Sequence, residues 1–88
     1  MSTKTITLSA PVEANGQQIT ALTFREATVG DLMAGSNFKD EMSQTIAVLA
    51  SISGVSVPTF KQIKARDLKR IMSEVGDLLG NGAETTGD

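Results

Sequence analysis

The sequence predicts an α+β domain: an N-terminal β-hairpin, or a small antiparallel sheet built on it, followed by three to four helices. Two patterns carry this prediction. The first 25 residues alternate apolar and polar side chains around an Asn-Gly pair, which is the strongest short signal for a hairpin. From residue 28 onward, apolar residues recur at the three- and four-residue spacing of one helix face, between residues that cap helices.

The hairpin is expected from a strand at residues 4–9, a turn at Asn15-Gly16 and a returning strand at residues 18–24. Asn and Gly both tolerate the positive φ that a two-residue type I′ turn requires. The returning strand is rich in β-branched and apolar residues, which favour strands. Because a lone hairpin is marginal in water, we expect its apolar face to pack on the helices or on another chain.

The strand register has to include an irregularity. A two-residue turn pairs Val12 with Ile19, and an unbroken ladder would then place the apolar residues of the two strands on opposite faces. One extra residue near Pro11, which cannot donate a hydrogen bond to a ladder, corrects this. We therefore expect a β-bulge or break at Ser9–Pro11. The apolar pairs expected beyond it are Leu8 with Leu22 and Ile6 with Phe24.

Capping residues divide the rest of the chain into helices. Thr28-Val-Gly-Asp31 is a capping sequence that begins a short helix. Ser36-Asn37 caps the next helix and Gly54 follows it, while Val55–Pro58 is expected to be extended because it ends in proline. Thr59–Gln62 is a second capping sequence. The predicted helices are residues 28–35, 38–53, 59–63 and 65–79.

The last predicted helix contains Gly76 in its interior, at a cost of about 1 kcal/mol relative to alanine. Two explanations stay open: Gly76 lets another helix approach closely, or it frays the helix end. The residues that follow are small and polar. We expect residues 1–80 to form one domain and residues 81–88 to form a flexible tail.

The amino-acid composition excludes several classes of functional site. The chain has 88 residues, a formal net charge of −2, and neither His nor Cys. The usual zinc and iron–sulfur sites, disulfides and thiol nucleophiles are therefore excluded, and we expect no metal and no cofactor. The carboxylates and lysines form no arrangement typical of catalysis, so we expect a protein that is not an enzyme. No apolar run is long enough to span a membrane, and the first residues do not begin a signal peptide, which favours a cytoplasmic protein.

Positive charge is concentrated in one segment. Five of the eight basic residues fall within ten positions, where Ile63 and Leu68 interrupt them as on an amphipathic helix. A solvated helix face is the first interpretation, contact with an acidic protein the second, and contact with nucleic acid the third, because the whole chain lacks the basic excess of a nucleic-acid binder. The five residues are Lys61, Lys64, Arg66, Lys69 and Arg70.

Two predicted helices carry wide apolar faces. Their apolar stripes are either ordinary core or surface left free for a partner helix, and both interpretations stay open. The first stripe consists of Met42, Ile46 and Leu49, and the second of Leu68, Ile71, Met72, Val75 and Leu79.

An ordered series of motifs runs through the chain: a strand with Leu8-x-x-Pro11, a hairpin with Asn15-Gly16, a second strand, and then Arg25-Glu26-x-Thr28-x-x-Asp31. Ser53-Gly54 at a helix end and Asp67-Leu68 at the start of the final helix continue it. The series resembles the small tail assembly chaperones of long-tailed bacteriophages, the group that contains the phage Mu and phage P2-like proteins. The resemblance covers residues 5–80 and is dense through residue 32.

This resemblance implies a non-enzymatic role in tail morphogenesis. Such a chaperone coats the long, helical, partly apolar tape measure protein in the host cytoplasm, keeps it soluble until the tail tube polymerises around it, and is absent from the finished virion. A frameshifted longer product is a further feature of many such phages. The expected partner-binding residues are those of the two apolar stripes, Met42, Ile46, Leu49, Leu68, Ile71, Met72, Val75 and Leu79, with a charged rim of Lys61, Lys64, Lys69 and Arg70.

Other interpretations stay open beside this one. A small structural tail or head-completion protein would remain in purified particles, whereas a chaperone would not. A small nucleic-acid-binding regulator would bind DNA with an affinity that falls steeply as salt rises. A second copy of the chain is an alternative partner, whereas a membrane is not an expected one.

Overall fold

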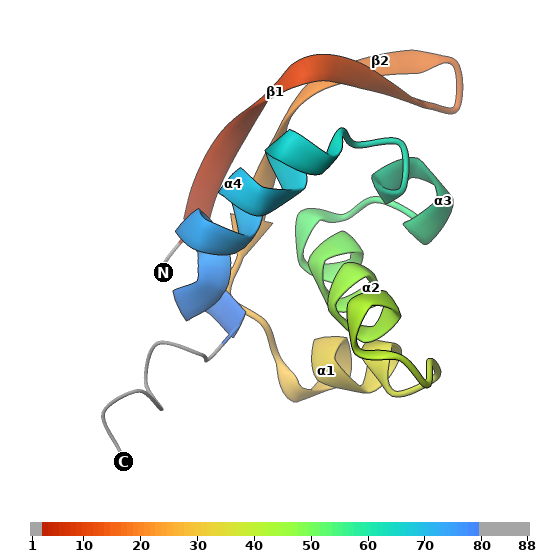
Figure 1. Ribbon diagram of the computed structural model, residues 1–88, viewed down its shortest axis with the longest axis vertical. Helices are drawn as coiled ribbons and strands as arrows, with labels where there is room; N and C mark the ends of the chain where they lie inside the picture. Colours follow the sequence, from red (N-terminus) through yellow and green to blue (C-terminus); the bar gives the residue numbers. More distant parts are fainter. Residues whose placement is uncertain (1–2, 80–88) are drawn as a thin grey trace.

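Two antiparallel strands arch over four α-helices and a short 3-10 helix in the computed structural model, which describes residues 3–79 (Figure 1). Helix α4 lies beneath the hairpin, α2 lies near the middle of the view, and α1 lies below α2. This arrangement confirms the predicted α+β class. The elements are β1 (Thr3–Ala14), β2 (Gln17–Arg25), α1 (Val29–Gly35), α2 (Glu41–Ser53), α3 (Val57–Phe60), α4 (Ala65–Val75) and the 3-10 helix η1 (Gly76–Leu79).

The hairpin turn has the predicted form. Asn15 and Gly16 both adopt positive φ, 53° and 80°, as a type I′ turn requires. Val12 pairs with Ile19 directly beyond the turn, as expected from a two-residue loop. The apolar face of the hairpin packs on the helices, which is one of the two arrangements expected for it.

The predicted irregularity in β1 is present, but it is larger than one residue. The register shifts between Thr7, which pairs with Ala21, and Val12, so that residues 8–11 lie opposite Thr20 alone. Ile6 therefore pairs with Leu22 and Lys4 with Phe24, and the predicted pairs Leu8–Leu22 and Ile6–Phe24 are wrong.

A contact with α4 accompanies this larger bulge. The backbone N–H and the hydroxyl of Ser9 both donate to Oδ2 of Asp67, each at 2.9 Å. The bulged segment of β1 is thus hydrogen-bonded to a helix that lies 58 positions further along the chain. A pattern of alternation within the two strands contains no information about such a contact, which is why the size of the bulge was mispredicted.

The core lies between the inner face of the hairpin and the helices. Leu49 of α2 and Ile71 of α4 are completely buried against that face. Phe24 of β2 and Phe60 of α3 meet edge to face, with ring centroids 6.4 Å apart, a favourable geometry for two aromatic rings. The buried cluster is Ile6, Leu8, Val12, Leu22, Phe24, Leu49, Ala50, Ile52, Phe60, Ile71, Val75 and Leu78.

Two helix starts differ from their predicted positions because other residues provide the caps. Helix α2 begins at Glu41, after Asp40 accepts a hydrogen bond from the Ser43 N–H at 2.8 Å, so Ser36-Asn37 is not its cap. Helix α3 begins at Val57, after the cap Ser56, and the predicted extended segment therefore stops short of Pro58. Proline is compatible with the first turn of a helix, where its missing N–H would have no partner.

The other helix ends agree better with prediction. Thr28 and Asp31 form the expected capping box at the start of α1, and Gly54 ends α2 with a φ of 76°. Helix α4 begins at Ala65 as predicted but ends at Val75, where η1 takes over. A Cβ added at Gly76 would meet nothing within 4 Å, so no helix approaches this glycine closely and it marks the change of helix type. The predicted tail at residues 81–88 lies outside the described residues.

Candidate partner-binding groove

The apolar residues predicted to bind a partner divide into two groups in the structure. Leu49, Ile71 and Val75 have no exposed surface and belong to the core, so they are corrected from partner-binding residues to core residues. They point into the space between the helices and the hairpin, where the two stripes meet the inner face of the sheet. The other five residues lie at or near the surface: Met42, Ile46, Leu68, Met72 and Leu79.

These five residues line one groove. Helix α4 packs on β1 and α2 packs on β2, and two adjoining hollows of about 440 and 220 Å³ lie between the two helices. Met42 lines both hollows. We call this feature the α2–α4 groove and define it by Met42, Thr45 and Ile46 of α2, Leu68 and Met72 of α4, and Leu79 of η1.

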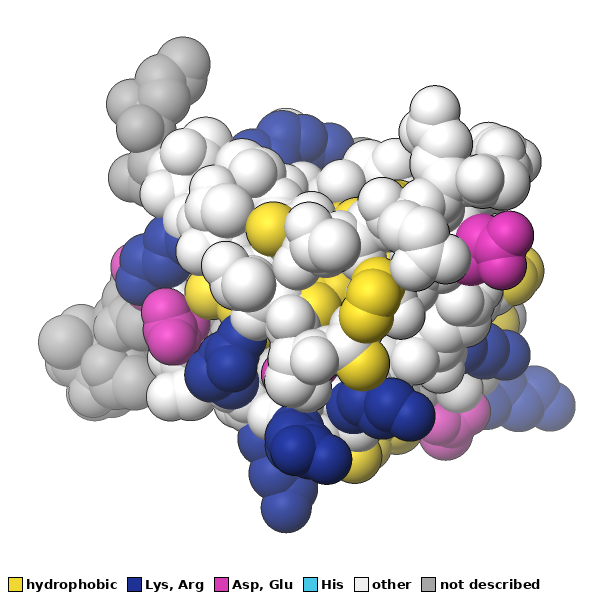
Figure 2. All heavy atoms as spheres, turned by 90° about the horizontal axis from the view of Figure 1, so that it is seen from above, with side chains coloured by type: hydrophobic (Ala, Val, Ile, Leu, Met, Phe, Trp, Pro, Cys, Tyr) yellow, Lys and Arg dark blue, Asp and Glu magenta, His cyan; other side chains and the backbone are white. Residues whose placement is uncertain are grey.

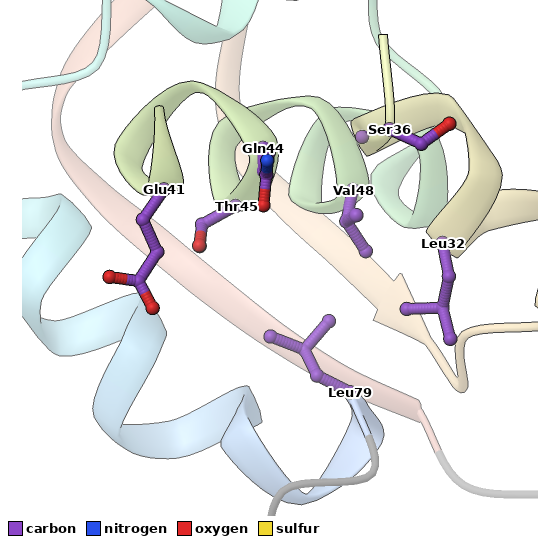
Figure 3. A pocket seen from close by; sticks show the side chains of 8 residues that line it. Leu32, Ser36, Glu41, Gln44, Thr45, Val48 and Leu79 are labelled. Atoms are coloured by element: carbon purple, nitrogen blue, oxygen red, sulfur yellow. The ribbon is translucent and has the colours of Figure 1, made fainter. Parts of the chain in front are cut away.

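The groove continues at both ends. Toward α1 it opens into a hollow of about 450 Å³, where Leu79 points toward α2 and faces Val48 and Leu32 (Figure 3). Toward α3 it continues into a hollow of about 230 Å³ between Phe38 and Val57. The concave surface therefore extends along much of α2, from its contact with α1, where Glu41 and Gln44 also line it, to its contact with α3.

Methionine supplies much of the exposed apolar surface of the groove. Met42 is 59% exposed and Met72 is 41% exposed, and both line the hollow of about 440 Å³. A methionine side chain is unbranched and polarizable, so it adapts to partners of different shape. Exposed apolar side chains gathered in one concave surface are typical of a protein-binding site.

The four predicted rim residues do not all lie beside the groove. Lys61 lines its α3 end, and Lys64 is the exposed residue immediately before α4. Lys69 is exposed on α4. Arg70 instead donates a hydrogen bond to the Thr7 carbonyl oxygen in β1, so its guanidinium is held at the hairpin. Figure 2 looks down on the molecule from the hairpin side of Figure 1, and on that face small hydrophobic areas lie between Lys and Arg side chains.

The geometry can be compared with known proteins. A family model described as phage tail assembly chaperone proteins, E, or 41 or 14, matches residues 5–80. The chain belongs to this family of phage tail assembly chaperones. No curated protein and no solved structure matches it. The matched range extends from β1 through η1, so every residue of the α2–α4 groove in this chaperone lies within it.

Asp67 is a buried residue of the chaperone that sequence reasoning missed. It is 1% exposed, although the sequence marked it only as part of the Asp67-Leu68 motif at the start of the final helix. Burial would raise the pKa of this carboxyl, but the two hydrogen bonds from Ser9 and the charges of Arg70 and Arg66 hold the pKa below its ordinary value. Asp67 lies four positions before Ile71, on the buried stripe of α4, and this spacing was the available signal.

Asp31 joins three elements of the chaperone. Beyond its role in the capping box, its carboxylate accepts two hydrogen bonds from the guanidinium of Arg25 in β2, at 2.7 and 3.0 Å. Ser51 of α2 donates to the same carboxylate at 2.5 Å. The hydrogen bonds from Arg25 and Ser51, and that from the Thr28 N–H, hold the pKa of Asp31 far below its usual range. This network fixes α1 and α2 relative to the hairpin and thereby sets one end of the groove.

Within residues 3–79, no cluster of three or more acidic, Cys or His side chains is placed to bind a metal ion. Over the same part of the chaperone, none of the helices combines the length and the apolar character that crossing a bilayer demands.

Proposed function

We propose that this chaperone binds the tape measure protein through the α2–α4 groove and keeps it soluble in the host cytoplasm during tail morphogenesis, as a non-enzymatic partner that leaves before the virion is complete. Family membership supports the role in tail assembly. The groove supports the choice of binding site, because exposed apolar residues of α2, α4 and η1 lie together in this one concavity.

The groove suits an apolar segment of helix. Helix-in-groove recognition places residues at three- and four-residue spacing along a hydrophobic channel, and the channel here runs along α2. Lys61 lies at the α3 end, where acidic residues on the partner would meet opposite charge. The favoured partner segment is therefore helical, apolar on one face, and acidic toward one end.

Co-expression with a tape measure fragment tests the site. Met42→Glu places a charge in the groove and should sharply reduce the soluble fraction of the fragment, because burying that charge without a partner is costly. Met33→Glu is the matched control: Met33 of α1 is 64% exposed, similar to Met42 at 59%, but it does not line the groove hollows. Its variant should solubilise the fragment as well as the wild-type chain does.

Two measurements keep the result interpretable. Thermal unfolding of each variant shows whether it folds, and Met72→Glu provides a second change in the groove from a different helix. Equal solubilisation by the wild-type chain and both groove variants would refute the groove as the site. A fragment that is equally insoluble with and without the wild-type chain would refute the function. Recovery of the chain from purified virions would favour a structural component instead.

A further inference from the structure

The concave surface formed by the α2–α4 groove and the hollows at its two ends has one charged residue toward each end. Of the described residues that line these four hollows, only Glu41 and Lys61 carry a charge. Glu41 lines the two hollows nearest α1 and η1, and Figure 3 shows its carboxylate extending from α2 toward α4 and η1. Lys61 lines the two hollows nearest α3. The surface is therefore negative toward one end and positive toward the other.

Both charges are available to a partner. Glu41 and Lys61 are exposed, and neither belongs to an ion pair within residues 3–79. Between them lie apolar side chains, and Met42 lines three of the four hollows. A partner that fills this surface excludes water from around both charges, which strengthens their attraction to an opposite charge and their repulsion from a like one.

The wall formed by α4 and η1 sets the distance between the two ends. Leu68 lines a hollow together with Lys61, and Leu79 lines both hollows that contain Glu41. The chain from Leu68 to Leu79 extends roughly 16 Å at the rise of about 1.5 Å per residue in a helix. A partner helix covers this distance in about three turns.

We propose that the groove selects a helical segment whose two ends, about three turns apart, have opposite charges, and that it holds this segment in one direction. The basic end lies beside Glu41 and the acidic end beside Lys61. This inference rests on the proposed function, because it takes the groove as the site that binds an apolar helix. Apolar burial provides most of the binding, whereas the reversed direction would bring like charges together at both ends. Glu41 and Lys61 therefore determine the direction of the bound helix.

Disulfide cross-linking can report this direction, because the chain contains no cysteine of its own. Ser36→Cys places a thiol at the hollow near α1, and Ser43→Cys places one at the hollow near α3. The probe is a designed helical peptide with a leucine stripe, acidic residues in its first turn and basic residues in its last turn. One version carries a cysteine at the acidic end and the other carries it at the basic end.

The two peptides should react with different variants. The cysteine at the acidic end should cross-link to Ser43→Cys, and the cysteine at the basic end should cross-link to Ser36→Cys. Each of these reactions should be roughly tenfold faster than the opposite pairing at low salt, because two attractive charge pairs replace two repulsive ones. Raising the salt concentration should reduce the preference, since salt screens exposed charges.

The double variant Glu41→Lys with Lys61→Glu is the matched control, because it reverses the charge at both ends and keeps the net charge unchanged. In this background the two peptides should exchange their cross-linking partners. Lys61→Glu alone, which leaves α2 unaltered, should remove the preference, because both ends of the surface are then acidic. Thermal unfolding of each variant shows whether it folds.

Three results would overturn the proposal. Peptides that bind the wild-type chain but react equally with both thiols would show that the groove binds a helix without a preferred direction. A preference that is the same in the charge-reversed variant would assign the direction to other residues. Peptides that do not bind at all would contradict the selection, whereas the solubility of a co-expressed tape measure fragment reports on the proposed function separately.

Discussion

At the scale of single residues, two buried carboxylates link parts of the chain that are distant in sequence. Asp31 joins Arg25 of the hairpin to Ser51 of α2, and Asp67 joins α4 to Ser9 in the bulge of β1. Hydrogen bonds to the ionised form lower the pKa of both groups. A carboxylate whose pKa is lower in the folded chain stabilises the fold above its unfolded pKa of about 4. It loses that contribution as the pH falls through the lower, folded-state value.

Asp31→Asn should therefore lower the free energy of unfolding at pH 7 by about 2 kcal/mol, because the amide cannot accept all the hydrogen bonds that the carboxylate accepts. Urea titration at pH 7 and at pH 3 measures the effect. The difference between variant and wild type should shrink at pH 3, because below about pH 4 the unfolded wild-type chain takes up a proton at Asp31 while the folded chain keeps the carboxylate ionised. A difference that is equal at the two pH values would contradict the assigned role of the charge.

At the scale of secondary structure elements, close contact between α1 and α2 depends on a glycine. A Cβ added to Gly35 would lie 2.8 Å from the backbone oxygen of Gln44 and 3.1 Å from a methyl carbon of Val48. The Gln44 oxygen is backbone and cannot rotate away. Gly30 of the same helix has only one neighbour, the Thr28 hydroxyl oxygen at 3.6 Å, which is an ordinary contact distance.

Gly35→Ala should destabilise the chain by roughly 1–3 kcal/mol, because α1 has to move away from α2. Gly30→Ala should instead be neutral or stabilising by about 0.5 kcal/mol, since alanine is the better helix former and space is available. Denaturant unfolding of the two variants measures how the same Gly→Ala substitution changes the free energy of unfolding at two positions of α1. An equal change in the free energy of unfolding for both variants would mean that α1 and α2 are further apart at Gly35 than the structure shows.

At the scale of the whole molecule, the hairpin is the surface on which separate helices are assembled. Helices α3 and α4 pack on β1 and α2 packs on β2, and the groove lies between α2 and α4. The core that holds this arrangement draws on residues from Ile6 in β1 to Leu78 in η1. Because the core contains residues from both strands and from the helices, the large apolar residues are buried only when all of these elements are folded together.

Removing residues 81–88 should leave the midpoint of thermal unfolding within about 2 °C of the full-length value, because residues 3–79 contain a buried cluster that runs from Ile6 to Leu78. Differential scanning calorimetry of the two chains makes the comparison. A shortened chain that stops at Val75 provides the contrast, since it lacks the buried Leu78 and should lose several degrees. An equal loss in both truncations would show that the domain extends beyond residue 80.

Local patterns were sufficient for the features that depend on neighbours in the chain. The Asn15-Gly16 turn, the Thr28 capping box and the Gly54 helix end were all predicted, because backbone conformation and short-range hydrogen bonds decide them. Apolar spacing identified the apolar stripes of α2 and α4. It could not separate Leu49, which is in the core, from Met42, which lies in the groove, because both follow the same helical stripe.

Residue types at short spacing were enough to predict the hairpin, the order of the helices and the resemblance to tail assembly chaperones. Packing of the helices on the hairpin sets how far β1 bulges, which residues of each apolar stripe stay exposed, and which side chains bond to β1. Contacts such as Ser9 with Asp67 and Glu13 with Gln62 bring together residues about 50 positions apart or more. Their geometry exists only once the helices have packed on the sheet.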